Sequence, residues 1–246
     1  HLGFHYPRSF LTRKQSKEGF KLFKKKYPSF SSKIKNNLYA ISKRTETIID
    51  FETYLQILKS SGLSYKRLDQ NKYGIKNISG LIKCDEEFVN TEKAKIFFLK
   101  KLKNRIKFNY EVKNYKKIND KFLIGEHKFD FLINCTWQQL LPQKKWDLSY
   151  ELCISALYKK KTKNLEAITI MDGPFYTLYP YRKNISNLYS VKHSRYKTSF
   201  KFDLINKKLK NIKNSDLTKI RYTMEKEFIE YYPNFKKEYK FVNFLK

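Results

Sequence analysis

Residues 165–193 read LEAITIMDGPFYTLYPYRKNISNLYSVKH, three runs of apolar, aromatic and β-branched residues separated by the clusters Asp-Gly-Pro and Arg-Lys-Asn. Runs of this composition between turn-forming residues are typical of successive β-strands. We therefore expect an antiparallel sheet in this part of the chain. The strands predicted for it span residues 150–158, 165–171, 175–181 and 187–193, and a further strand spans 235–245.

Helical and extended segments alternate in the first hundred or so residues, and a further helix is predicted near the C-terminus. Phe20 and Phe23 fall on one helical face, and Pro28 ends that helix. Asn90 and Ser215 suit helix starts, because their side-chain oxygens accept hydrogen bonds from free backbone N–H groups. The predicted helices span residues 12–27, 50–61, 90–103 and 215–231, with extended segments at 37–42 and 73–83.

Residues 105–136 change to a period of two, which predicts a strand to Val112, a short meander and a last strand at 129–135. That last strand is almost continuously apolar. Such strands are typical of sheets that are buried on both faces. Together with the helices, these patterns predict a mixed α/β fold of the α+β kind.

The net charge of the chain is +30, from 53 basic and 23 acidic residues. A charge of this size favours nucleic acid or another polyanion as a partner. Only eight of the basic residues are Arg, however, and the Lys residues are scattered along the whole chain. The composition is also poor in Ala and Gly and rich in Asn, so a skew toward A/T-rich codons explains the Lys excess more simply. We expect no specific nucleic-acid partner.

The cysteine and histidine patterns indicate neither a disulfide framework nor a metal site. The three Cys are far apart without a CxxC pair, which favours a reducing compartment, and we expect the cytoplasm. His1 and His5 are four residues apart, but Gly3 and Pro7 disfavour the helix that would bring them to one metal. No apolar run approaches the length needed to span a membrane.

The densest cluster of polar chemistry is the opening run HLGFHYPRS, residues 1–9, with two His, one Arg, one Gly and one Pro. It begins without an initiator Met, and we expect natural sequence upstream of it. His and Arg can bind an anion or move a proton, and Gly lets a ligand approach the backbone closely. An ordinary turn before a helix is the alternative.

The order of these segments resembles the FAD-dependent oxidoreductases of the D-amino-acid oxidase type. Three motifs carry the resemblance, which covers most of the chain. They are residues 1–9 with Thr12 and Gly19, residues 89–91 with Val112 and residues 130–137, and residues 172–175 with 178–182 and 191–194.

The resemblance implies a partial FAD/NAD(P)-binding Rossmann-like domain interleaved with an antiparallel-sheet substrate domain. It assigns residues 1–35 and 75–145 to the remnant of the FAD domain. Residues 36–74 and 146–246 then form the substrate domain. FAD is the implied cofactor, and a small molecule is the implied partner; the oligomeric state stays open.

The resemblance also implies which residues lie beside the cofactor. The opening run would flank the flavin, Val112 would touch adenine through its backbone, and the strand after it would end beside the dinucleotide. Trp137 stands where the family has Gly. The implied cofactor-binding residues are His1, Gly3, His5, Tyr6, Arg8, Val112, Cys135, Thr136 and Trp137.

The implied activity of the intact protein is oxidation of a small amine or 2-hydroxy acid by hydride transfer to flavin. The aromatic residues and His193 are alternatively ordinary residues of a sheet face, Arg182 is alternatively part of a turn, and Glu86 and Glu87 are expected at the surface. The implied catalytic residues are His5, Arg8, Tyr181, Arg182 and His193.

These 246 residues contain no GxGxxG loop, which in this family holds the FAD pyrophosphate at a helix N-terminus. We therefore expect this chain alone to bind FAD poorly and to be inactive. Two other classes of function stay open. One is a basic module that binds polyanions, and the other is a non-catalytic relative in which His1, His5 and Arg8 point away from the cavity.

Overall fold

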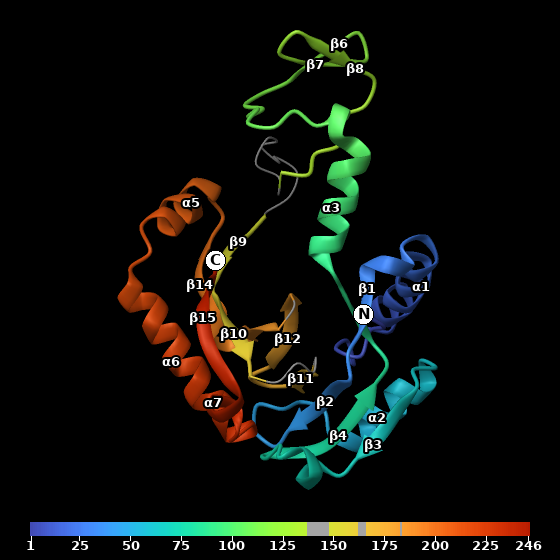
Figure 1. The fold of residues 1–246 in the computed structure, drawn as a ribbon, viewed down its shortest axis with the longest axis vertical. Coiled ribbons are helices and arrows are strands. Elements are labelled where there is room, and N and C mark those ends of the chain that lie inside the picture. The colour runs from blue at the N-terminus through green and yellow to red at the C-terminus, as the bar shows by residue number, and fades with distance from the viewer. Residues whose placement is uncertain (137–147, 162–165, 183) are drawn as a thin grey trace.

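The computed structural model describes residues 1–136, 148–161, 166–182 and 184–246. A large sheet crosses the body of the molecule, and helices lie on both sides of it (Figure 1). A long arm, defined as residues 91–136, extends away from this body. The mixed α/β fold class expected from the sequence is confirmed.

Eight strands form the large sheet, in the order β15-β10-β13-β12-β11-β2-β4-β3. All neighbouring pairs are antiparallel except β11 and β2, which run parallel. Three neighbouring strands come from the stretch 165–193, as predicted. In sheet order the strands span Tyr239–Leu245, Ser155–Lys160, Ile185–Ser190, Tyr176–Arg182, Glu166–Met171, Asn36–Ser42, Ile78–Cys84 and Tyr65–Leu68.

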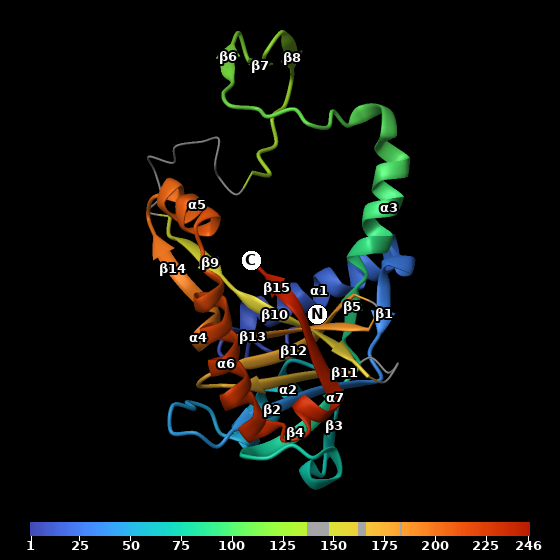
Figure 2. The same ribbon diagram turned by 60° about the vertical axis from the view of Figure 1, so that its left-hand side comes forward.

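The two faces of this sheet pack against different helices. On β2, Leu38 belongs to the core that α6 (Asn214–Tyr231) covers, whereas the next residue, Tyr39, belongs to the core under α2 (Phe51–Ser60). Successive side chains of a strand point to opposite faces, so this alternation follows from strand geometry. Figure 2 shows α6 running along its side of the sheet. Phe228 of α6 is fully buried there, and burial of such a side chain contributes about 1.5–3 kcal/mol.

The helix α1 (Phe10–Lys26) follows the opening run. It begins where the backbone N–H of Thr12 donates to Ser9 Oγ at 3.2 Å, and it ends before Pro28, as predicted. Beyond it, β1 (Ser31–Lys33) pairs with β5 (Glu87–Val89) in a separate two-stranded sheet. This pairing brings β5 next to α1.

The arm contains α3 (Thr91–Leu102), which confirms the predicted helix, and a three-stranded meander. The meander consists of β6 (Lys116–Ile118), β7 (Lys121–Ile124) and β8 (His127–Phe129), and it lies at the far end of the arm (Figures 1 and 2). No residue from 91 to 136 is buried. The arm therefore has no hydrophobic core of its own.

Two strands predicted in the arm are absent. Residues 106–115 and 130–136 have no helix or strand, and Phe131 and Ile133 are 85% and 84% exposed. A strand needs a neighbouring backbone for its hydrogen bonds, and no described strand lies along either segment. The prediction of a strand at 129–135 buried on both faces is therefore wrong.

The C-terminal half differs from the predicted strands where polar residues interrupt them. Ser190 Oγ caps the helical turn α4 through the N–H of His193, which removes His193 from the predicted strand 187–193. Arg195 of β14 pairs with Cys153, so β9 leaves the large sheet. The elements that differ are β9 (Tyr150–Cys153), α4 (Val191–Ser194), β14 (Arg195–Ser199), α5 (Phe202–Lys210) and α7 (Phe235–Glu238).

The predicted division into two domains crosses the large sheet. β2 and β4 are hydrogen-bonded neighbours, although the division places one in each domain. The division stays a prediction.

Within the described ranges, no helix is long and apolar enough to cross a membrane. The same ranges contain no group of three or more His, Cys, Asp or Glu side chains arranged to hold a metal ion. Cys84, Cys135 and Cys153 are all free thiols.

Candidate active site

The opening run folds into a compact turn in which three rings gather. The ring centroid of His1 lies 4.7 Å from that of His5 and 5.5 Å from that of Tyr6. Gly3 has a φ of +103°, and a Cβ at this position would lie 2.9 Å from the Cα of Arg13. Only glycine combines this backbone conformation with so close an approach. The glycine of the motif therefore lets the turn lie directly on α1.

Arg13 of α1 holds the turn in place. Its side chain is buried and donates hydrogen bonds to the carbonyl oxygens of Tyr6 at 2.8 Å and Pro7 at 2.6 Å. Its Nε donates to Ser61 Oγ at 2.7 Å. A guanidinium presents several donors in fixed directions, so one residue fastens the turn to both α1 and the end of α2. No motif in the sequence distinguishes Arg13 from the other basic residues of this helix.

A buried carboxylate, that of Glu86, also binds the backbone of this turn. Glu86 is 1% exposed, and its Oε1 accepts hydrogen bonds from the backbone N–H groups of Leu2 and Gly3. Its Oε2 accepts the hydroxyl proton of Tyr39 at 2.6 Å, and Tyr39 Oη lies 2.8 Å from His5 Nδ1. The expectation that Glu86 lies at the surface is wrong. Its partners are distant in the sequence, so no local pattern marks it.

The buried position of this chain of groups changes their protonation. Burial lowers the pKa of His5, because the charged ring loses hydration, although the Glu86 carboxylate opposes the change. Burial also raises the pKa of the Tyr39 hydroxyl, and the charge of Glu86 raises it further. Near neutral pH, His5 is therefore a neutral imidazole and Tyr39 keeps its proton.

His1 and His5 face the open side of the large sheet across a cavity of about 400 Å³. Thr169 of β11 and Thr177 and Tyr179 of β12 form the sheet side of this cavity. These side chains alternate with the residues of β12 that pack under α6, so strand geometry turns them toward the histidines. Burial raises the pKa of the Tyr179 hydroxyl, which thus stays a hydrogen-bond donor.

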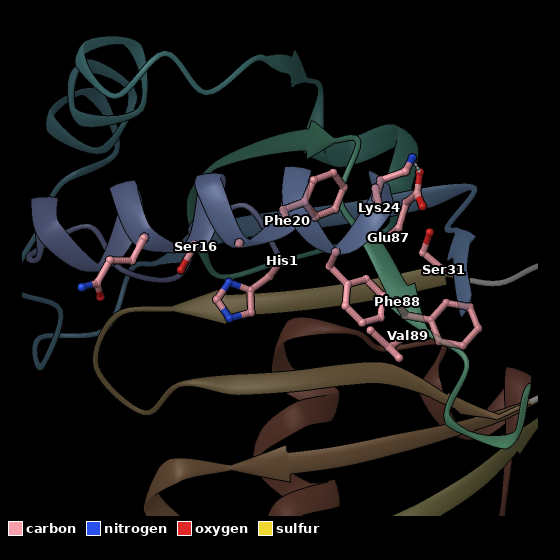
Figure 3. Close-up of a pocket in the computed structure, with 11 residues that line it drawn as sticks. His1, Ser16, Phe20, Lys24, Ser31, Glu87, Phe88 and Val89 are labelled. Atoms are coloured by element: carbon pink, nitrogen blue, oxygen red, sulfur yellow. Dashed lines mark hydrogen bonds and ion pairs between the residues drawn. The ribbon is translucent and has the colours of Figure 1, made fainter. Parts of the chain in front are cut away.

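A second cavity of about 420 Å³ adjoins the first and shares His1 and the residues of β5 with it. It lies between α1 and β5, where Phe20 and Phe88 form apolar walls (Figure 3). The Lys24 ammonium lies 2.5 Å from Glu87 Oε1. Burial opposes ionisation of Glu87, but the hydrogen bonds from Lys24 and Ser31, together with the charges of Lys24 and Lys33, outweigh it and lower the pKa of this carboxyl. The two cavities together combine apolar walls with a few polar groups, as ligand sites do.

Arg8 lines neither of these two cavities. Its guanidinium is 63% exposed and lies 3.6 Å from Asp172 Oδ1, in the turn after β11. Asp172 in turn accepts hydrogen bonds from the backbone N–H groups of Ile48 at 2.8 Å and Ile49 at 3.0 Å. The structure thus brings His1 and His5 to the cavity and leaves Arg8 outside it.

Tyr181 and Arg182 lie at the end of β12, beyond the cavity. The Arg182 guanidinium stacks over the Tyr181 ring at 5.0 Å and lies 3.6 Å from Glu92 Oε1, at the start of α3. About half of this guanidinium is exposed. These contacts place both residues at the base of the arm.

His193 lies on the other side of the sheet. Its Nε2 is 2.9 Å from Glu227 Oε1 of α6, and Glu227 also accepts the hydroxyl proton of Tyr176 at 3.0 Å. Burial opposes ionisation of Glu227, but the Tyr176 hydroxyl and His193 outweigh it and lower the pKa of the carboxyl. The structure therefore separates His193 from His1 and His5.

The residues predicted to lie beside the dinucleotide come together elsewhere. Val112, Cys135 and Thr136 line one cavity of about 720 Å³ at the inner side of the arm, which α5 closes with Phe202. Val112 is more than twenty positions from Cys135 and Thr136 in the sequence, so their meeting is a property of the fold. Trp137 lies outside the described residues.

Two solved structures share the fold of this chain. The glycine oxidase of Geobacillus kaustophilus matches with a TM-score of 0.63 at 10% identity, over 99% of this chain and 69% of that one. The L-proline dehydrogenase of P. horikoshii also matches with a TM-score of 0.63, at 12% identity over 96% and 66%. The chain therefore has the same fold as these two enzymes.

The resemblance predicted from the sequence is thereby confirmed. The FAD-dependent monooxygenase FPY4 of Fusarium mangiferae is 27% identical to the chain over 249 residues, which cover 98% of the chain and 65% of FPY4. The chain thus spans slightly less than two thirds of this curated relative. No family model matches it.

Proposed function

We propose that the protein containing these residues is an FAD-dependent oxidoreductase. Its substrate is a small molecule with an oxidisable amine or hydroxyl group, of the amine or 2-hydroxy-acid type. FAD, when bound, supplies an acceptor for the hydride. The similarity to FPY4 and to two structures of flavoenzyme fold supports this proposal.

The cavity between the histidines and the open face of β12 is the observation that carries the proposal. A flavin ring needs an apolar surface for its plane and hydrogen-bond donors at its edge. Phe88 and Val89 offer the apolar surface, and the hydroxyls of Thr177 and Tyr179 offer donors. The donor set fits the group. In this proposal His5 takes the proton that leaves the substrate as it is oxidised.

The cavity at the arm supports the adenine end of the same cofactor. Val112, Cys135 and Thr136 are the residues for which the resemblance implied contact with the dinucleotide, and they share this cavity. In our proposal, residues 1–35 and 75–145 contribute to the FAD domain and the rest to the substrate domain. Of the five predicted catalytic residues, His5 is the one whose position supports a role best.

The test is the flavin content of the full-length natural protein. We expect it to purify with the visible absorption bands of flavin, and denaturation to release FAD. The chain of 246 residues alone is the control, and we expect it to retain little flavin because it has no GxGxxG loop. A full-length protein that stays colourless after incubation with excess FAD would contradict the proposal.

The substrate class is tested separately, by anaerobic mixing with small amines and with 2-hydroxy acids. We expect one class to bleach the flavin absorption, and His5→Ala to slow bleaching on the order of a hundredfold or more. Bleaching by neither class would remove the substrate proposal and leave the cofactor proposal standing. We also propose a cytoplasmic location, since all three cysteines are free thiols.

A further inference from the structure

The hydrogen bonds that link His5 to Tyr39 and Tyr39 to Glu86 have one fixed direction. Tyr39 Oη carries a single proton, and Glu86 Oε2 accepts it at 2.6 Å. The hydroxyl oxygen then has only lone pairs to offer His5 Nδ1, which lies 2.8 Å away. This contact is a hydrogen bond only when Nδ1 carries the proton.

The orientation of the Glu86 carboxylate is fixed by backbone N–H groups, which can donate hydrogen bonds but cannot accept them. Its Oε1 faces the backbone N–H groups of Leu2 and Gly3, which are donors alone. The short connection between β4 and β5 that carries Glu86 is held by Asn37 Nδ2, which donates to the Glu86 carbonyl oxygen at 3.3 Å. Glu86 and Tyr39 are both almost fully buried, so water does not compete for these bonds.

We propose that Glu86, acting through Tyr39, is a positioning residue that holds His5 as the Nδ1–H tautomer and leaves the lone pair of Nε2 free for the ligand in the cavity. His5 lines that cavity, and no hydrogen bond from a described residue occupies Nε2. The tautomer of a histidine is set by the partner of its other nitrogen. The role of Nε2 as a base rests on the proposed function, whereas the tautomer itself does not.

Glu86→Gln is the decisive variant, because it reverses the direction of the hydrogen bonds between Glu86, Tyr39 and His5. The amide oxygen must face the N–H groups of Leu2 and Gly3, which leaves the amide NH₂ to donate to Tyr39 Oη. The Tyr39 hydroxyl must then donate to His5 Nδ1, so the ring proton moves to Nε2. The variant changes neither the size of the side chain nor the number of hydrogen bonds.

The measurement is the ¹⁵N–¹H correlation spectrum of the His5 ring in the purified protein, above the pKa of His5. We expect Nδ1–H in the natural protein, Nε2–H in Glu86→Gln, and loss of the Nδ1–H preference in Tyr39→Phe. Tyr54→Phe is the matched control, since Tyr54 is equally buried in the same core but donates to the Phe4 carbonyl at 3.1 Å. We expect it to keep the Nδ1–H form.

An Nε2–H ring in the natural protein overturns the inference even if no variant folds. An unchanged tautomer in a folded Glu86→Gln protein overturns it as well. If the full-length protein binds FAD, we expect Glu86→Gln to lower kcat by on the order of a hundredfold while the bound flavin is retained. A protein without flavin refutes the proposed function alone, because the tautomer is measured without the cofactor.

Discussion

The large sheet and the arm are built from similar sequence patterns but have opposite environments. β2 buries six of its seven residues, whereas residues 91–136 bury none. Both regions contain alternating apolar residues, yet only the sheet has neighbours that cover them. An apolar pattern therefore identifies a segment that can be buried, and the partner decides whether it is.

The largest expected contrast is between two phenylalanines. Phe228→Ala removes a fully buried ring that packs on Tyr176 and Phe235, and we expect a loss of about 3–5 kcal/mol in the free energy of unfolding. Phe131→Ala removes a ring that is 85% exposed, and we expect a change within about 0.5 kcal/mol. Urea denaturation of both variants measures the contrast. Equal losses would show that the arm is as tightly packed as the sheet.

The sequence was sufficient for the parts of the fold whose partners are close in the chain. The three strands in residues 165–193 are joined by short turns, so their own composition specifies the hairpins. Residues 129–135 have the composition of a buried strand, but no described strand pairs with them beyond Phe129, which ends β8. Local pattern alone could not reveal that absence.

The candidate site shows the same limit. The opening run could be singled out because its polar residues are consecutive. Glu86 could not, because it touches Tyr39, 47 positions away, and Gly3, 83 positions away. The family resemblance groups His193 with the site, but the face of the sheet on which it lies depends on the helical turn at Ser190. Contacts between distant segments decide both cases.

Two glycines extend the comparison to backbone sites. Gly80 lies in β4 of the large sheet, and an added Cβ would come within 2.2 Å of the buried ring of Phe51, the first residue of α2. We expect Gly80→Ala to destabilise the protein by about 1–3 kcal/mol, as overpacking does. Gly19 of α1 has no atom within 4 Å of such a Cβ, so Gly19→Ala is expected to stabilise by about 0.5–1 kcal/mol. Thermal melts of the pair report the opposite signs, and a shared sign would contradict the packing described for β4.

Two helix caps compare the body with the arm directly. Asp50 accepts the N–H of Thr53 at 2.9 Å at the start of α2, and Asn90 accepts that of Lys93 at 3.0 Å at the start of α3. Loss of either cap weakens its helix by about 1 kcal/mol. Because α2 is packed on the sheet and α3 buries no residue, we expect Asp50→Ala to lower global stability. Asn90→Ala should instead speed amide hydrogen exchange within α3 and leave the melting temperature of the protein unchanged. A lower melting temperature for Asn90→Ala would show that the arm unfolds together with the sheet.

The smallest expected effect is on how the free energy of unfolding changes in acid, through Glu227 of α6. Burial opposes ionisation of Glu227, but the hydroxyl of Tyr176 and the contact with His193 outweigh it, so the pKa of this carboxyl is below its ordinary value of 4.5. A group with a lowered pKa in the folded state stabilises the protein above its unfolded pKa, and this stabilisation is lost as pH falls through the folded pKa. We therefore expect Glu227→Gln to flatten the decline in stability below pH 4.5. Glu52→Gln, which alters an exposed pair with Arg67, is the control and should leave that decline unchanged. The stability of both variants could instead fall as steeply with pH as that of the natural protein. The contact of Glu227 with Tyr176 and His193 would then contribute nothing to the loss of stability in acid, and other carboxylates such as Glu87 would account for it.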